Sequence, residues 1–345
     1  MLVRAARSAD LSSLLRLAGD AGSGLTSLPA SEERLARRLD TVEASFDGGV
    51  APADADYLFV LEDQAGQVVG TSGMLAAAGL REPWYSYRMG LTVTASRELD
   101  VYRQHPTLFL VNDLTGATAL CSFYLPPAQR EVANGRLLSK ARFLFMAEYP
   151  ADFSSRVIVE MRGLSDAQGR SPFWDSLGKH FFRMEFARAD YLTGIGSKAF
   201  IAEMMPKFPL YACFLSQAAR EAIGQVHPDS ELGLAMLREE GLTHQGYIDI
   251  FDGGPTLEAS LGQVRAISDS RLLVLATGTP GDEAETFLIH NRGRHNCRII
   301  AAPARMAAGT LVVSPESAER LALRAGAPVR AVSLVSASPA ASLFR

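Results

Sequence analysis

The stretch QREVANGRLLSK, residues 129–140, lies between a strand-like run, LCSFYL, and a helix-like run, GRLLSKARFLFMAEY. Small residues in such a strand-to-helix turn have two explanations. Either the turn is tight and serves packing alone, or its backbone amides bind a phosphate. The second explanation is physically possible because a helix N-terminus offers unpaired N–H groups and a partial positive charge. Both explanations predict a mixed α/β fold, and the choice between them bears on function.

The same turn resembles a coenzyme A-binding motif. Residues 130–135, Arg-Glu-Val-Ala-Asn-Gly, fit the pattern Arg/Gln-x-x-Gly-x-Gly/Ala of the GCN5-related N-acyltransferases. The resemblance implies that backbone amides around residues 132–137 bind the coenzyme A pyrophosphate. The cofactor-binding positions within the turn are then Arg130, Ala133, Asn134 and Gly135. Ala133 departs from the pattern, because it replaces the usual first glycine and alanine adopts a positive φ only at a cost.

Composition places the chain among folded proteins and excludes several classes. Its 345 residues are 48% hydrophobic and 21% charged, which allows a large core. The net charge of −4 gives no sequence-independent affinity for nucleic acid. Three separated cysteines without a C-x-x-C pair fit a reducing compartment, and no run of about 18 apolar residues predicts a membrane span. We therefore expect a cytoplasmic protein that binds neither nucleic acid nor membrane.

Strands and helices alternate over residues 1–255, for which we expect the catalytic domain. Two apolar runs around a turn within residues 56–77 predict a hairpin, and RVIVEMRGL, residues 156–164, predicts a central strand. SPFWDSLGKHFFRMEF, residues 171–186, predicts one amphipathic helix capped by Ser171. The segment 198–242 is expected to be mostly helical, with interruptions at its prolines.

A change of pattern begins near residue 256, where short β-like runs alternate with Gly, Pro and Asp turns. This pattern predicts a smaller β-rich domain over residues 256–345. Within it, GTLVVSPESAERLALRAGAPVRAVSL, residues 309–334, has the order strand, capped short helix, Ala-Gly turn and strand. That order resembles the half-repeat of double-psi β-barrels, so a barrel is the candidate architecture of this domain.

Long segments over nearly the whole chain resemble the arginine N-succinyltransferase family in order and spacing. They include REPWYSYRMGLTV (81–93), PTLFLVNDLTG (106–116), GRSPFWDSLGKHFF (169–182), IGQVHPDS (223–230) and GYIDIFDGGPTLEA (246–259). Two C-terminal segments, ATGTPGDEAE and AAPARMAAGTLVV, resemble the β-subunit branch of the arginine/ornithine succinyltransferases. The resemblance implies an acyl-CoA N-acyltransferase fold. It also implies succinyl transfer from succinyl-CoA to the α-amine of L-arginine, the first step of the succinyl-transfer route of arginine catabolism.

Two site residues follow from this resemblance. Leu125, at the end of the strand before the turn, matches the position that binds succinyl-CoA, and it would act through its main chain where that strand splays from its neighbour. His227, in Val-His-Pro-Asp, matches the catalytic proton donor. An imidazole suits aminolysis of a thioester, since the attacking amine loses a proton and the leaving thiolate takes one. Without the resemblance, Leu125 could equally be a core leucine and His227 a structural histidine.

Recognition of arginine requires charged groups whose identity the sequence leaves open. A guanidinium needs a carboxylate, while the carboxylates of both substrates need donors. Candidates on two segments are Glu160, Arg162, Asp249 and Asp252. Glu160 and Arg162 fall on one face of the predicted strand, but structural ion pairs and turn caps explain all four residues equally well. Further candidates are Arg88, Asn112 and Lys140.

Other chemistry has less support. Residues 194–199 match G-x-G-x-x-A but lack the acidic residue of a dinucleotide site, and P-loop, HExxH and GxSxG patterns are absent. His290, His295 and Cys297 lack paired metal-ligand spacing, so we expect no metal. Because no cysteine lies in an activating motif, we expect direct transfer in a ternary complex without an acyl-enzyme.

Two alternatives stay open. The acceptor could be ornithine or another amine, because recognition of coenzyme A through the backbone does not depend on the acceptor. Alternatively, the chain could be a non-catalytic subunit that pairs with a paralogous α-subunit. His227 and the near-intact phosphate turn favour a catalytic chain, which we expect to form a homo- or hetero-oligomer.

Overall fold

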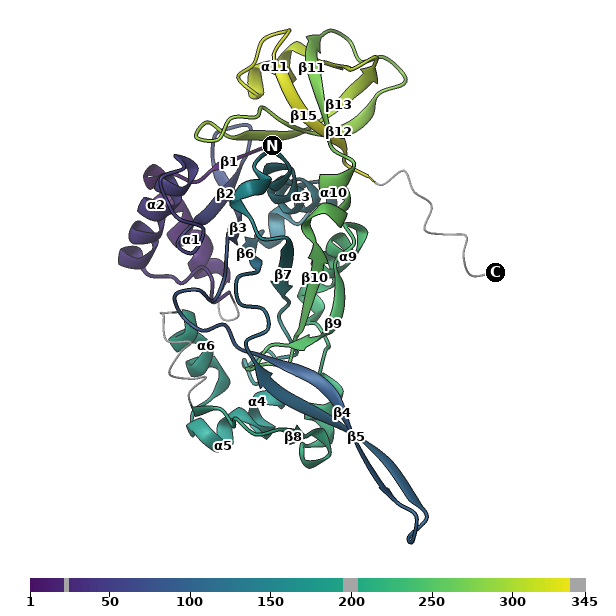
Figure 1. Cartoon of the computed structure of the whole chain (residues 1–345). Helices are drawn as coiled ribbons and strands as arrows, with labels where there is room; N and C mark the ends of the chain where they lie inside the picture. Colours follow the sequence, from purple (N-terminus) through teal and green to yellow (C-terminus); the bar gives the residue numbers. More distant parts are fainter. Residues whose placement is uncertain (22–24, 195–203, 336–345) are drawn as a thin grey trace.

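Fifteen strands form one continuous sheet in the computed structural model, which describes residues 1–21, 25–194 and 204–335 (Figure 1). The first ten strands precede the C-terminal part of the chain. They are β1 (Leu2–Ala5), β2 (Asp56–Glu62), β3 (Val68–Leu75), β4 (Ser86–Ser96), β5 (Val101–Val111), β6 (Thr118–Tyr124), β7 (Arg156–Glu160), β8 (Leu210–Tyr211), β9 (Thr243–Ile248) and β10 (Pro255–Ser260). Their order in the sheet is β1-β2-β3-β6-β7-β10-β9-β4-β5-β8.

The pair β6 and β7 sets the architecture of this part. These two strands are parallel, while the other neighbouring pairs among the first ten strands are antiparallel. Parallel neighbours need a crossover connection, which helix α3 (Val132–Glu148) supplies. The structure thereby confirms the strand, turn and helix predicted around residues 129–140, and it confirms a mixed α/β fold. The predicted hairpin within 56–77 is present as β2 and β3.

Helix α3 is central to the core. Residues 134–147 of this helix are buried apart from half-exposed Arg136, so the helix is covered on all sides. Phe145 meets Phe46, Tyr57 and Phe59 with ring centroids 5.3–5.4 Å apart, a spacing typical of packed aromatic pairs. The other helices of this part are α1 (Leu11–Ala21), α2 (Glu32–Phe46), α4 (Pro172–Ser176), α5 (Gly178–Phe182), α6 (Phe186–Gly194), α8 (Gln217–Ala222), α9 (Glu231–Glu239) and α10 (Arg265–Ser268). Among the described residues, no helix is both long and apolar enough to cross a bilayer.

The single helix predicted over residues 171–186 is wrong. Ser171 caps α4 as predicted, accepting a hydrogen bond from the Trp174 N–H at 3.3 Å. The helix then breaks, and α5 begins at Gly178, where any side chain would collide with the indole ring of Trp174. Arg183 ends α5 in the left-handed region at φ 48°. Packing against the tryptophan therefore overrides the helical pattern of the sequence.

Helix also covers less of the next segment than predicted. Residues 195–203, which include most of the G-x-G-x-x-A pattern, lie outside the described residues. Between residues 204 and 242 the structure describes α8 and α9 as its longer helices, with strand β8 and short 3-10 turns between and before them. Pro228 starts one of these turns, which ends the extended segment that precedes α9.

The C-terminal part closes into a barrel, shown at the top of Figure 1. Its elements are β11 (Arg271–Thr277), β12 (Glu285–His290), β13 (Arg298–Ala307), β14 (Thr310–Val313), α11 (Pro315–Arg320) and β15 (Pro328–Ser333). The strand order is β12-β15-β11-β14-β13, and β13 pairs again with β12. The predicted order of strand, capped helix, turn and strand is confirmed, with Ser314 as the cap and Gly326 in the turn at φ 90°. β1 pairs with β13 and so joins the barrel to the first sheet.

A long hairpin of β4 and β5 projects from the opposite end of the molecule (Figure 1). Strand pairing places Leu91, Val93 and Tyr102 on one face, since Leu91 and Val93 alternate with Thr92 and Tyr102 lies opposite Ala95. These apolar side chains are exposed, Leu91 to 63% and Tyr102 to 67%. A two-stranded ribbon with a bare apolar face is marginal in water alone, so this face is suited to contact another protein surface.

Candidate active site

A cavity of about 370 Å³ opens where β6 and β7 separate. Their pairing ends at Leu120 and Val159, although β6 continues to Tyr124 and the chain beyond β7 runs on to Arg162. The cavity is lined on one side by residues 121–125 and on the other by residues 159–162. This separation is the splay expected from the sequence at the strand carrying Leu125.

A β-bulge at Ser122 shapes the β6 wall of the cavity. Ser122 has a positive φ of 51°, and the register of β6 against β3 shifts at the same place. The strained residue is held from outside the strand. Its N–H donates to Ser27 Oγ at 2.9 Å, and Arg38 donates to its Oγ at 2.9 Å while forming an ion pair with Asp56. Strain of this kind persists where several contacts fix it, often beside a functional site.

Leu125 lies at the end of this wall. Its side chain is 6% exposed and packs against Gly70, where an added Cβ would collide with it. Its carbonyl accepts a hydrogen bond of 3.0 Å from Arg130 Nε. Arg130 therefore folds back onto the strand end, although it also lines the cavity. The two residues form one corner of the cavity, next to the first turn of α3.

The N-terminus of α3 has packing contacts, and its first N–H groups lack partners within the helix. Ala133 lies in the first helical turn without a positive φ, so its substitution for glycine causes no strain there. It is exposed, and the first N–H groups of a helix have no partner within that helix. Asn134 Nδ2 donates to the Gln129 carbonyl at 3.3 Å. Gly135 serves packing, because an added Cβ would lie 3.2 Å from Met236 Cε of α9.

Arg142, the most deeply buried cation of the cavity wall, was not among the candidates predicted from the sequence. Gly135, Ser139 and Arg142 share one face of α3 at spacings of four and three residues, and all three line the cavity. Arg142 is 2% exposed, and its Nε donates to the Ser139 carbonyl at 3.1 Å. Burial lowers the pKa of the Arg142 guanidinium to about 10, which leaves it charged at neutral pH. The only sequence signal was its position seven residues after Gly135.

The opposite wall carries the acidic candidates. Glu160 and Arg162 both line the cavity, as do Asp249 and Asp252. The Asp252 carboxylate accepts hydrogen bonds from two backbone N–H groups, that of Gly163 at 2.7 Å and that of Gly254 at 2.8 Å. Asp249 caps its own turn through the N–H groups of residues 251 and 252. For these two aspartates the structure shows turn-capping contacts, one of the explanations that the sequence left open.

His227 stands immediately beside this wall. The backbone N–H of His227 donates to the Arg162 carbonyl at 2.8 Å, and the ring Nδ1 accepts from the Asp229 backbone N–H at 3.2 Å. Asp229 and Ser230 line the cavity, whereas His227, whose side chain is 15% exposed, is not among the lining residues. Burial and the nearby Arg162 guanidinium lower the pKa of His227 from 6.5, against smaller opposing effects of Asp229 and Ser165. The imidazole is therefore neutral at pH 7, with its proton on Nε2 because Nδ1 accepts a hydrogen bond.

The remaining candidates lie away from the cavity. Lys140 is 1% exposed and forms ion pairs with Glu239 and Glu240. Arg88 pairs with Asp113 at 3.7 Å on the surface, and Asn112 donates to the Trp84 carbonyl. None of these three side chains lines the cavity.

The histidines and cysteine of the possible metal site do not converge. His290 is fully buried and lies 3.4 Å from Cys297 Sγ, while His295 turns outward and pairs with Asp47. Burial lowers the pKa of His290 to about 4, so it stays neutral. Over the described ranges, no group of three or more His, Cys, Asp or Glu side chains is placed to hold a metal ion.

Comparisons with known proteins identify the family of this chain. Residues 1–266 match the family model described as arginine N-succinyltransferase beta subunit, and residues 270–333 match the C-terminal domain of that subunit. Arginine N-succinyltransferase subunit beta of Pseudomonas aeruginosa is 62% identical over 334 residues, which cover 97% of this chain and 98% of that protein. Arginine N-succinyltransferase of Yersinia pseudotuberculosis is 49% identical over 342 residues, with 97% and 98% coverage.

A solved structure gives the same result. Arginine/ornithine succinyltransferase subunit AI from Pseudomonas aeruginosa superposes with a TM-score of 0.88 at 39% identity, covering 97% of this chain and 99% of that one. Sequence and structure therefore agree along nearly the entire length of these relatives, barrel included. The chain belongs to the arginine N-succinyltransferase beta-subunit family.

Proposed function

We propose that this chain transfers the succinyl group of succinyl-CoA to the α-amine of L-arginine, on a fold of the acyl-CoA N-acyltransferase type. One observation carries the proposal. The cavity lies in the opening between β6 and β7, and its wall continues along α3 from the first turn of that helix. An extended pantetheine arm can follow the separated strand, while the helix N-terminus favours a pyrophosphate. The family to which the chain belongs supports the same reaction.

In this proposal the coenzyme A pyrophosphate binds backbone amides around residues 132–137. Arg130, Ala133, Asn134 and Gly135 form the turn that admits it, and Leu125 contributes main-chain groups at the end of β6. The thioester then lies in the splay, close to the bulge at Ser122. Main-chain N–H groups turned toward the thioester would stabilise the negative charge of the tetrahedral intermediate.

His227 is the proposed proton-transfer group. The neutral imidazole takes the proton that the attacking amine loses and returns it to the coenzyme A thiolate, so no proton accumulates on the enzyme. Its lowered pKa supports this role, because the ring is neutral at pH 7 and its imidazolium is a ready acid.

The succinyl group passes directly from the thioester to the amine, without an acyl-enzyme. Burial raises the pKa of the Cys121 thiol, the cysteine that lines the cavity, which disfavours a cysteine nucleophile.

L-Arginine enters against the wall that carries His227. Glu160 and Asp229 are the carboxylates proposed for its guanidinium, since both line the cavity. Arg162 is the proposed donor to its α-carboxylate. The Arg162 guanidinium borders the cavity, its Nη2 bonds only Ser165 Oγ at 3.0 Å, and its buried Nε has no hydrogen-bond partner among the described residues.

Release of free thiol from succinyl-CoA by the purified chain tests this proposal. We expect rapid release with L-arginine and much slower release with L-ornithine at equal concentration. Release with ornithine alone would support succinyl-CoA as the donor and would change the proposed acceptor from arginine to ornithine. Release with neither, despite binding of coenzyme A, would favour the non-catalytic subunit, which a paralogous α-subunit should then activate.

We also propose that the chain works as a subunit of an oligomer, homomeric or with a paralogous α-subunit, through the β4–β5 hairpin. The relatives are themselves named as subunits. Replacing Leu91 and Val93 together by serine should convert the assembly to monomers in size-exclusion chromatography with light scattering, because it removes the exposed apolar face. Thr94→Ala, on the opposite face of the hairpin, should leave the mass unchanged. An unchanged mass in the double variant would place the interface elsewhere.

A further inference from the structure

We propose that Arg142 binds the terminal carboxylate of the succinyl group and so selects a dicarboxylic acyl donor. This inference rests on the proposed function, because it assigns a subsite within the same cavity. Its first basis is the buried positive charge of the Arg142 guanidinium. Arg142 is 2% exposed, yet among the described residues no Asp or Glu forms an ion pair with its guanidinium.

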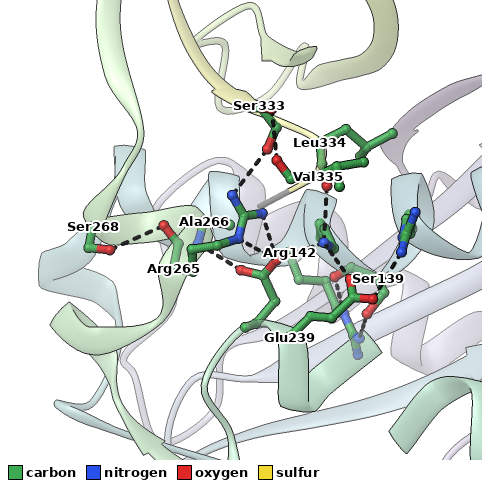
Figure 2. Close-up of polar contacts among 12 residues, drawn as sticks. Ser139, Arg142, Glu239, Arg265, Ala266, Ser268, Ser333, Leu334 and Val335 are labelled. Carbon is green, nitrogen blue, oxygen red and sulfur yellow. Dashed lines mark hydrogen bonds and ion pairs between the residues drawn. The ribbon is translucent and has the colours of Figure 1, made fainter. Parts of the chain in front are cut away.

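The contacts of Arg142 leave part of the guanidinium unused. Nε donates to the Ser139 carbonyl and Nη2 to Ser139 Oγ, both at 3.1 Å (Figure 2). The guanidinium also lies over the Phe123 ring, 5.6 Å from its centroid, which brings the side chain from α3 across to β6. These contacts fix the plane of the group without neutralising it. Burying an isolated charge is costly, so the position is suited to a ligand that brings a negative charge.

The place of Arg142 in the cavity fits the donor rather than the acceptor. Gly135, Ser139 and Arg142 line the cavity in succession along α3, so Arg142 lies roughly 10 Å further along the helix than Gly135. A coenzyme whose pyrophosphate binds the first turn of α3 therefore carries its acyl end toward Arg142. The neighbouring wall residues, Cys121 and Phe123, belong to β6, the strand proposed to hold the thioester. Arg162 also lines the cavity, but it stands on the opposite wall beside His227.

A carboxylate matches the geometry of the Arg142 guanidinium. A guanidinium offers parallel N–H donors to two oxygens, and such charge-assisted bonds are stronger than neutral ones. Succinyl-CoA ends in a carboxylate at the place where butyryl-CoA ends in a methyl group. The pair of thioesters therefore measures the contribution of the terminal carboxylate, since chain length and coenzyme are the same, and the Arg142 variants then measure the share of that residue.

Binding of succinyl-CoA, butyryl-CoA and free coenzyme A by calorimetry tests the inference without any acceptor. The wild-type protein should bind succinyl-CoA more tightly than butyryl-CoA by roughly 10- to 100-fold, the range for a charge-assisted contact. Arg142→Met should abolish this preference while affinity for free coenzyme A stays the same. Thermal stability should be equal or higher, because the substitution removes an uncompensated buried charge.

Two further variants keep the test decisive. Arg142→Lys retains the charge but not the paired donors, and it should keep part of the preference even if Arg142→Met folds poorly. Arg156→Met, a half-buried arginine of β7 that pairs with Glu258 outside the cavity wall, is the matched control and should keep the full preference. Retention of the preference in both Arg142 variants would overturn the inference and leave the proposed function intact. Failure of the wild-type protein to bind any coenzyme A ester would overturn both.

Discussion

Replacing His227 by asparagine should lower kcat for succinyl transfer by about 10²- to 10⁴-fold, the contribution typical of a positioned acid–base group. Asparagine is chosen because His227 also caps the 3-10 turn Pro228–Ser230, its Nδ1 accepting the Asp229 N–H. An asparagine side chain can make the same capping bond but cannot carry a proton. The His227→Asn variant should therefore unfold at the wild-type temperature and still bind coenzyme A.

The pH profile distinguishes proton transfer from a positioning role. Burial and Arg162 lower the pKa of His227, so the acid limb of the wild-type kcat/KM profile should have a midpoint below 6.5. kcat/KM falls at low pH because protonation of His227 removes the base that the amine needs. The asparagine variant should lose this acid limb. His295→Ala, an exposed histidine of the barrel, should keep both rate and profile. A His227→Asn variant with nearly wild-type kcat would assign the proton transfer to another group.

Local patterns in the sequence predict much of this fold. The barrel segment at 309–334 was predicted in detail because each of its elements follows from nearby residues: a Ser cap, a short helix, a glycine turn and two β-branched runs. The strand, turn and helix around residues 129–140 are equally local, since chain direction and helix capping act over a few residues. The family resemblance then indicated Leu125 and the turn, both of which line the cavity or border it.

Contacts between distant segments account for what the sequence did not predict. The bulge at Ser122 depends on Arg38 and Ser27, which lie 84 and 95 residues away, so no local pattern in β6 announces it. The break at Gly178 depends on how Trp174 packs in three dimensions. Arg142 was missed for a similar reason. In sequence it is one of three cations in the helix, and its lack of a carboxylate partner among the described residues becomes visible only when the surrounding walls are in place.

Lys140, one of the further candidates for substrate binding, lies instead in an ion network away from the cavity. Its Nζ lies 2.9 Å from Glu240 Oε1 and donates to the Leu334 carbonyl at 3.1 Å. Glu240 is fully buried and also pairs with Arg265 at 2.7 Å. Arg265 in turn donates to the Ser333 carbonyl at the end of β15. The network therefore ties the proposed cofactor helix α3 to the last strand of the barrel.

Replacing Glu240 by glutamine should lower the free energy of unfolding by about 3–5 kcal/mol, the cost of breaking a buried ion pair by removing one partner. Arg265 would lose the carboxylate that it pairs with, and Lys140, 1% exposed, would pair with Glu239 instead of with two carboxylates. The neighbouring Glu239 is the matched control. Its side chain is 36% exposed and pairs with Arg136 and Lys140, so Glu239→Gln should cost about 0–1 kcal/mol. Urea unfolding of both variants measures the difference.

The comparison of the two glutamates tests whether the barrel supports the active site. If Glu240 joins α3 to the barrel, Glu240→Gln should also weaken coenzyme A binding, because the first turn of α3 loses its fixed position relative to β6. Adding succinyl-CoA should then restore part of the lost stability, since a ligand that binds the folded state stabilises it. Equal stabilities of the two variants would mean that Lys140 and Arg265 are satisfied by the carbonyls of Leu334 and Ser333 alone. In that case the barrel would be attached mainly through the pairing of β1 with β13.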